Sequence, residues 1–190
     1  GKQNKLEVLR STSVGMFLGG DRIEDVLLPF KSIPQGLEVG DDIDVFVYTD
    51  AEDRAFATTL TPKIELDSYA ALEVAAVASM GVFFDMGIEK SLFVPAKEQN
   101  APVKVGDKRI VYMFVDPKTQ RLLGSMKWRE FCFKEDPEFE VKQKVKVMIG
   151  EQTDLGRNVL IENEWYGLIY ANEIFEKLEI GDERDAYIKT

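Results

Sequence analysis

The sequence predicts an all-β protein made of tandem five-stranded barrels, the third of them incomplete at its C-terminal end. Three observations lead to this prediction. The 190 residues contain an internal repeat, each copy shows short apolar runs between turn residues, and a Gly-Asp turn recurs in every copy. The repeat divides the chain into three units, which we take as the predicted domains: residues 1–62, 66–130 and 139–190.

Landmark residues at a fixed spacing define the first two copies. Each member of the first set recurs 66 residues later: Gly15 as Gly81, Pro29 as Pro95, Gly40 as Gly106 and Asp50 as Asp116. Four landmarks at one offset are hard to obtain by chance.

The third copy is weaker and lies 75 residues after the second, with Gly156, Tyr170 and Gly181 at the positions of Gly81, Pro95 and Gly106. The extra residues fall in the linker around Asp136 and Pro137. Because Thr190 aligns with Val115, the third copy lacks its last strand, and we expect a truncated chain.

Five apolar runs in each of the first two copies have the length and the bounding residues of short strands. In the first copy they are Leu6–Leu9, Met16–Leu18, Asp25–Leu28, Asp44–Tyr48 and Arg54–Thr58. In the second they are Ala70–Ala78, Val82–Phe84, Leu92–Val94, Arg109–Val115 and Leu122–Ser125. Five short strands closed as a small Greek-key barrel are typical of the OB-fold, although another small barrel of similar strand count remains an alternative.

Helical segments are expected to be few. Tyr69–Ala78 is Ala-rich and favours a helix on propensity alone, but the repeat aligns it with Leu6–Leu9 and therefore predicts a strand. The stretch between the third and fourth strands is too short and polar for more than one helical turn. Helices remain plausible at Lys127–Phe133 and Asn172–Leu178.

Composition excludes several classes of function. The chain has no His and one Cys, so a Ser-His-Asp triad, a His-ligated metal and an intramolecular disulfide are all excluded. A metal site in the Asp41-Asp42-Asp44 run lacks a second ligand cluster, and we expect no cofactor. No secretory signal or membrane-length apolar run is visible, which predicts a soluble cytoplasmic protein without a membrane partner.

The net charge of −10 is unevenly distributed. Residues 1–62 hold 6 basic and 11 acidic residues, a net charge of −5. Residues 63–130 hold 10 and 9, a net of +1, and residues 131–190 hold 8 and 14, a net of −6. Since phosphate contacts dominate nucleic-acid affinity, the second unit is the best candidate for binding RNA.

The ordered landmarks resemble the S1-type RNA-binding domain of ribosomal protein S1. The resemblance rests on a Gly-x-Phe after the first strand, a Val-Gly-Asp turn, and a strand ending in Asp with Arg a few residues on. In the first copy these are Gly15, Phe17, Gly40, Asp41, Asp50 and Arg54, and in the second Gly81, Phe83, Gly106, Asp107, Asp116 and Arg121.

The tandem copies, with their Leu-Leu-Pro and Phe-Val-Pro strand ends, most resemble the conserved virulence factor B family of bacterial regulators. Its members are similar to three such domains followed by a winged helix, and the resemblance implies binding of single-stranded RNA. Two departures weaken the implied site: Val14 and Met80 replace an aromatic residue, and Pro29 and Pro95 replace a His.

The implied RNA face lies on strands two, three and five, and stacking of bases on aromatic rings beside basic groups is how such barrels bind single strands. The resemblance places Phe17, Arg54, Phe83, Asp116, Arg121 and Tyr170 on it. The charge of the second unit adds Lys108, Arg109, Lys127 and Arg129.

Each candidate has a plainer interpretation. Phe17 and Phe83 lie on the strand face opposite their apolar neighbours, which exposes them if those neighbours fill the core, but both are otherwise core or linker residues. Arg54 and Arg121 otherwise pair with the nearby Asp50 or Asp116. For Trp128, docking of a linker helix between domains is favoured over base stacking.

Two functions from different classes follow. The leading one is a non-catalytic RNA-binding regulator, with single-stranded RNA as its partner. The alternative is a protein-interaction scaffold that has kept the barrels and lost RNA contacts, with a protein as its partner. A metal-dependent nuclease is disfavoured, because no clustered Asp/Glu set is visible.

Overall fold

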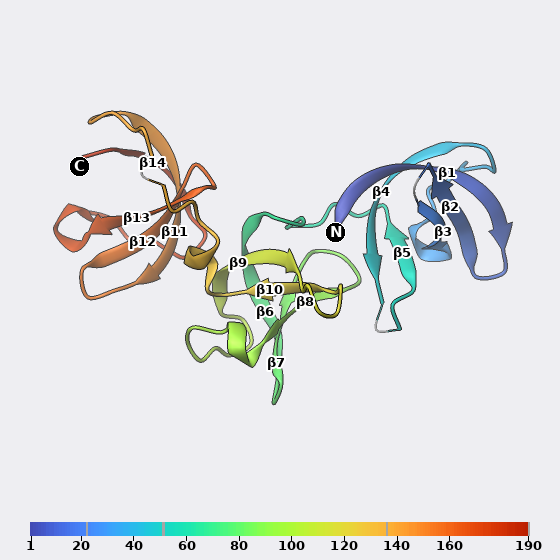
Figure 1. The fold of residues 1–190 in the computed structure, drawn as a ribbon, viewed down its shortest axis with the longest axis horizontal. Coiled ribbons are helices and arrows are strands. Elements are labelled where there is room, and N and C mark those ends of the chain that lie inside the picture. Colours follow the sequence, from blue (N-terminus) through green and yellow to red (C-terminus); the bar gives the residue numbers. More distant parts are fainter. Residues whose placement is uncertain (22, 51, 136, 190) are drawn as a thin grey trace.

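The computed structural model describes residues 1–21, 23–50, 52–135 and 137–189. Its three groups of strands follow one another in a row (Figure 1). Ala51 in the predicted hairpin loop, Asp136 in the linker and the aligned Thr190 lie outside the described residues. Among the described residues, no helix has the length and apolar character needed to cross a membrane.

The first unit is a closed barrel in which the strands follow the order β1-β2-β3-β5-β4. The strands are β1 (Lys2–Thr12), β2 (Gly15–Gly20), β3 (Ile23–Pro29), β4 (Asp42–Thr49) and β5 (Ala55–Thr58). The short β5 closes the barrel, because it pairs antiparallel with β4 and parallel with β3 through Leu27 and Phe56. Each predicted strand of this copy is present, the last one beginning at Ala55 and not at Arg54.

The second unit repeats this arrangement as a sheet in the order β10-β9-β6-β7-β8, with β10 beside β8. Its strands are β6 (Tyr69–Ala78), β7 (Gly81–Asp85), β8 (Ser91–Pro95), β9 (Lys108–Val115) and β10 (Leu122–Ser125). The Ala-rich segment is the strand β6, as the repeat predicts. Ala70, Leu72 and Val74 are buried at every second position, which is the period of a strand.

The third unit has four strands in the order β13-β12-β11-β14. They are β11 (Lys144–Gln152), β12 (Gly156–Ile161), β13 (Trp165–Tyr170) and β14 (Glu183–Tyr187). β11 pairs with β12 and β14 as β1 pairs with β2 and β4. The predicted fold class, tandem barrels with an incomplete third, is therefore confirmed.

Two helix predictions are wrong in extent. The linker forms a single 3-10 turn, η3 (Trp128–Glu130), and a similar turn, η4 (Ala171–Glu173), replaces the helix expected at Asn172–Leu178. Helices so short are marginal without tertiary packing. The other two turns, η1 (Phe30–Ser32) and η2 (Ala96–Glu98), lie between third and fourth strands, as predicted.

The barrels are joined through a strand that is buried on both faces. On β4, Val45 points into the core of the first barrel, whereas Phe46 and Tyr48 belong to the core of the second. Alternation along a strand sends neighbouring side chains to opposite faces, so one strand contributes to two cores.

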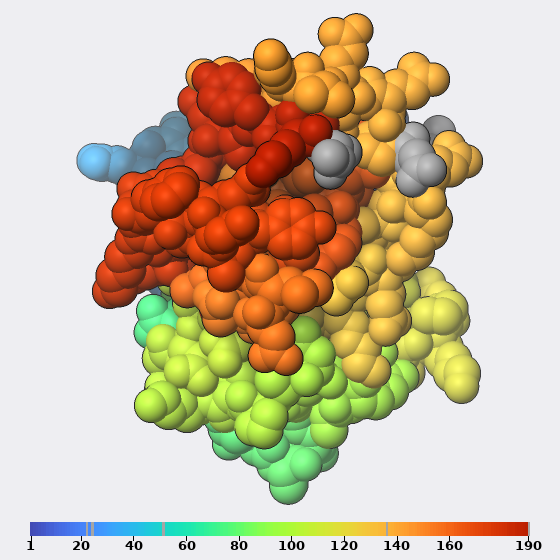
Figure 2. Space-filling view, turned by 90° about the vertical axis from the view of Figure 1, so that its left-hand side faces the viewer, coloured from blue at the N-terminus to red at the C-terminus, as the bar shows by residue number. Residues whose placement is uncertain are grey.

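The same arrangement recurs at the next junction. On β9, Val111 and Met113 fill the second barrel, while Ile110 and Tyr112 pack with Trp128 and Leu160 of the linker and the third unit. Tyr112 lies 66 residues after Phe46, so the repeat carries the junction as well as the barrel. Trp128 is fully buried between the units, as predicted, and Figure 2 shows the third unit lying directly against the second.

Truncation of the shared aromatic side chain tests the first junction. We expect Phe46→Ala to lower the free energy of unfolding by about 3–5 kcal/mol, because a fully buried ring is lost and a cavity remains. The matched control is Phe175→Ala, where the ring is 92% exposed and the change should stay within about 0.5 kcal/mol. Urea denaturation followed by circular dichroism measures both, and equal values for the two variants would contradict the shared core.

Candidate nucleic-acid interface

The outer face of the second barrel carries two neighbouring aromatic rings. Phe83 on β7 lies opposite Phe93 on β8, and their ring centroids are 4.9 Å apart. Both rings are half-buried, while the flanking Val82 and Phe84 are buried in the core. The predicted orientation of Phe83 is therefore observed: the ring lies on the outer face of the sheet.

Gly81 makes room for the second ring. A Cβ atom at position 81 would lie 2.7 Å from the Phe93 ring and 2.3 Å from the Val94 carbonyl oxygen, so only glycine lets the ring cross the strand here. Sequence reasoning missed Phe93. The available signal was its position in the repeat, since it follows Leu27 by 66 residues and Leu27 lies opposite Phe17.

The first barrel presents a different surface at the same place. Phe17 is half-buried on the outer face of β2, with the aliphatic Leu27 as its cross-strand partner. The Arg10 guanidinium lies 4.3 Å from the Phe17 ring centroid and forms an ion pair with Asp25 at 2.5 Å. A base approaching Phe17 therefore competes with a cation that is held by a carboxylate.

Arg54 forms ion pairs within its own loop. Its side chain contacts Asp50 at 2.6 Å and Glu52 at 3.0 Å, as the plainer interpretation predicted for Asp50. Asp50 also accepts hydrogen bonds from the backbone N–H groups of Glu52 and Arg54, so the carboxylate organises the loop. The arrangement is a closed acidic turn around one arginine.

Arg121 does not pair with Asp116, which corrects the alternative considered above. Instead it reaches the first barrel, where it donates two hydrogen bonds to Asp53, at 2.9 and 3.0 Å. Asp116 accepts hydrogen bonds from the Thr119 hydroxyl and the Lys118 backbone N–H. These contacts hold the pKa of Asp116 below its usual value, chiefly through the Thr119 hydrogen bond.

The remaining candidates are spread over the molecule. Lys108 and Arg109 begin β9, with Lys108 exposed and Arg109 lying 3.7 Å from Asp107. Tyr170 ends β13 and is 50% exposed. The structure therefore does not gather all ten predicted residues into one surface.

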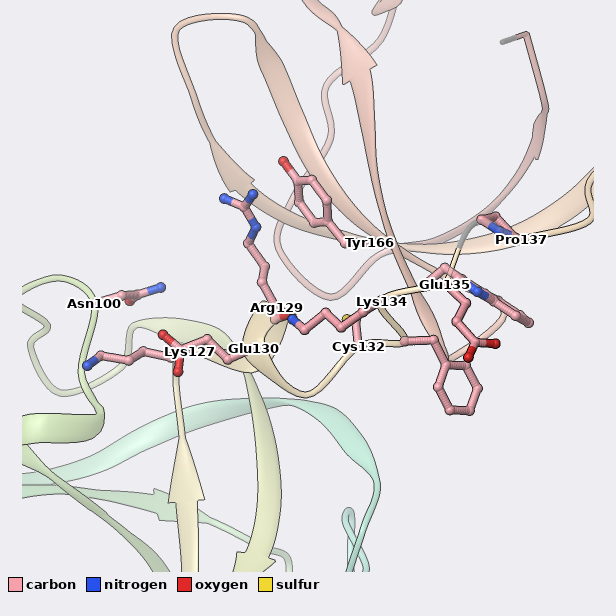
Figure 3. Close-up of a pocket in the computed structure, with 11 residues that line it drawn as sticks. Asn100, Lys127, Arg129, Glu130, Cys132, Lys134, Glu135, Pro137 and Tyr166 are labelled. Atoms are coloured by element: carbon pink, nitrogen blue, oxygen red, sulfur yellow. The ribbon is translucent and has the colours of Figure 1, made fainter.

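Lys127 and Arg129 are brought together at a cleft between the second and third units (Figure 3). Arg129 reaches across to β13, where its guanidinium lies 3.8 Å from the Tyr166 ring centroid. Sequence reasoning placed both basic residues near Trp128 but could not foresee that the linker directs them toward an aromatic ring from another unit. Among the described residues, no group of three or more Cys, Asp or Glu side chains could hold a metal ion.

These features agree with the comparisons to known proteins. A family model of the S1 domain matches residues 1–60, the first barrel. Over 114 residues the chain is 36% identical to "Uncharacterized protein YitL" of Bacillus subtilis (strain 168), which is 57% of this chain and 38% of that relative. The chain thus spans well under two thirds of the relative's length.

A solved structure extends the likeness over the whole chain. It is a multidomain protein with nucleic acid binding domains from Streptococcus pneumoniae TIGR4, with a TM-score of 0.59 and 22% sequence identity. The match covers 98% of this chain and 68% of that chain. At this identity the likeness establishes a shared fold.

The bridge between the barrels predicts a shifted titration. The Arg121 hydrogen bonds hold the pKa of Asp53 below its usual value, so the bridge is present above that usual pKa and is lost as pH falls through the lowered one. In Arg121→Gln, we expect the pKa of Asp53 to rise toward its ordinary value in a carboxyl NMR titration. Asp85, whose pKa is lowered chiefly by Lys63, is the internal control and should not move. An unchanged Asp53 titration would show that the bridge does not form in solution.

Proposed function

We propose that this protein binds single-stranded RNA as a non-catalytic cytoplasmic regulator of the conserved virulence factor B family. The observation that carries the proposal is the pair of rings, Phe83 and Phe93, side by side on the outer face of the second barrel. Phe83 occupies an S1 landmark position. The S1 match of the first barrel and the printed description of the Streptococcus pneumoniae neighbour support the same function.

The second barrel is favoured over the first on three grounds. Its aromatic pair has no guanidinium held over it by a carboxylate of the kind that Arg10 and Asp25 form over Phe17. Its unit has a net charge of +1 against −5 for residues 1–62. A negative field repels phosphate, and the phosphate term dominates affinity for nucleic acid.

A cation stands close to the aromatic pair. Lys97 lies in η2, the turn that directly follows β8 and its Phe93. It forms no ion pair with a carboxylate among the described residues, so its ammonium is available to a phosphate. Bases on the rings and phosphates beside Lys97 would reproduce the mode of OB barrels, which combine stacking with a basic groove.

Direct binding measurements test the proposal. We expect Phe83→Ala and Phe93→Ala each to weaken binding of a fluorescein-labelled 12-nucleotide single strand by about 1–3 kcal/mol in fluorescence anisotropy, because each removes a stacking surface. Phe175→Ala is the matched control, since it removes an exposed ring from the third unit, and it should leave binding unchanged.

A protein-interaction scaffold is the second candidate, and the ion-paired state of Arg54 and Arg121 favours it. Absence of RNA binding by the native protein at low salt, together with a protein partner retained after nuclease treatment, would select the scaffold. Equal affinities for the native protein and both Phe variants would instead move the RNA site away from β7 and β8.

A further inference from the structure

The strongest unassigned feature is the cleft between the second and third units. It has a volume of about 580 Å³ and lies between the linker that follows β10 and the strand β13. Figure 3 shows Lys127 and Asn100 on the side of the second barrel, Tyr166 on the side of the third unit, and Glu135 and Pro137 at the opposite end. The cleft is separate from the β7–β8 face.

Three cations on its rim lack carboxylate partners. Lys127, Arg129 and Lys134 form no ion pair with any carboxylate in the described ranges, although Glu130 and Glu135 line the same cleft. This contrasts with Arg54 and Arg121, which are held by Asp50 and Asp53. In a chain of net charge −10, three uncompensated cations around one hollow make a local attraction for an anion.

The cation at the centre is held in place by its aromatic neighbour. The Arg129 guanidinium is exposed and lies 3.8 Å from the Tyr166 ring centroid. The Tyr166 hydroxyl donates a 2.7 Å hydrogen bond to the buried Asn158 amide oxygen, which fixes the ring. The Lys134 ammonium donates to the Arg129 carbonyl oxygen at 3.1 Å, so two of the three charges lie close together.

An exposed aromatic platform completes the cleft. Phe133 is 60% exposed, and its ring centroid lies 5.5 Å from that of Trp165. Phe139 packs edge-on against Trp165 at 5.2 Å and supports it from a neighbouring hollow. Leaving a large ring in water without covering it costs free energy that a stacked planar group would recover.

We propose that this cleft binds one nucleotide of a single-stranded RNA, with the base stacked on Phe133 and the phosphate held by Lys127, Arg129 and Lys134. A nucleotide combines a flat aromatic group with an anion, which are the two groups that the cleft is built to satisfy. An acidic peptide would satisfy the cations and leave the Phe133 ring uncovered. The inference rests on the proposed function and adds a second subsite to it, at the junction of two units.

Binding measurements on surface variants test the subsite. We expect Phe133→Ala to weaken binding of the 12-nucleotide strand on the order of 5- to 150-fold, the equivalent of one lost stacking contact. The double variant Lys127→Gln with Lys134→Gln should reduce the slope of log affinity against log salt by about 0.7 per phosphate contact removed. Phe175→Ala and Lys118→Gln are the matched ring and charge controls. Arg129→Lys keeps the charge and loses the planar contact with Tyr166, and should fall between Arg129→Gln and the native protein.

Ultraviolet cross-linking of the same strand, with mass spectrometry of the linked peptides, separates the two proposals. Cross-links to the peptides that hold Phe133 or Trp165 support the subsite. Binding with cross-links only to Phe83 or Phe93, and with unchanged affinity in Phe133→Ala, overturns the subsite and leaves the proposed function standing. No binding and no cross-link overturns both. Near-ultraviolet circular dichroism of each variant confirms that the fold is retained, and Phe133→Tyr, which preserves the ring, should bind as the native protein does.

Discussion

The structure depends on a strand that belongs to two hydrophobic cores at once. A strand has two faces, and in a small barrel one of them normally meets water. In β4 and β9 both are buried, because the outward face packs against the next unit through Phe46 and Tyr112. Each barrel therefore gains apolar burial that a domain of its size cannot obtain alone.

This constraint also determines where binding surfaces can lie. Because β4 and β9 are used for docking, the outer faces of β2–β3 and β7–β8 remain accessible, and these are the faces that carry Phe17 and Phe83. The second junction differs from the first in containing a linker, whose turn η3 buries Trp128 and directs Arg129 toward Tyr166. The cleft is thus a consequence of how the second and third units are joined.

The prediction of the site was partial for identifiable physical reasons. Period-two alternation was enough to place Phe83 on the outer face, because its neighbours Val82 and Phe84 are apolar and fill the core. Phe93 was missed because its role comes from cross-strand register, which pairs residues that are distant in sequence. Arg121 was expected beside Asp116 by sequence proximity, yet its partner is Asp53 in the other barrel.

The sequence by itself determined the number of units, their strand order and the faces of most strands, since these follow from local periodicity and a repeat with a constant offset. Even the strand β6 followed from the repeat, against its helical propensity. Only the tertiary structure decided which charges are neutralised and which remain uncompensated. Arg121 is paired, whereas Lys127, Arg129 and Lys134 form no ion pair within the described ranges, because ion pairing depends on distances between units that no local pattern encodes.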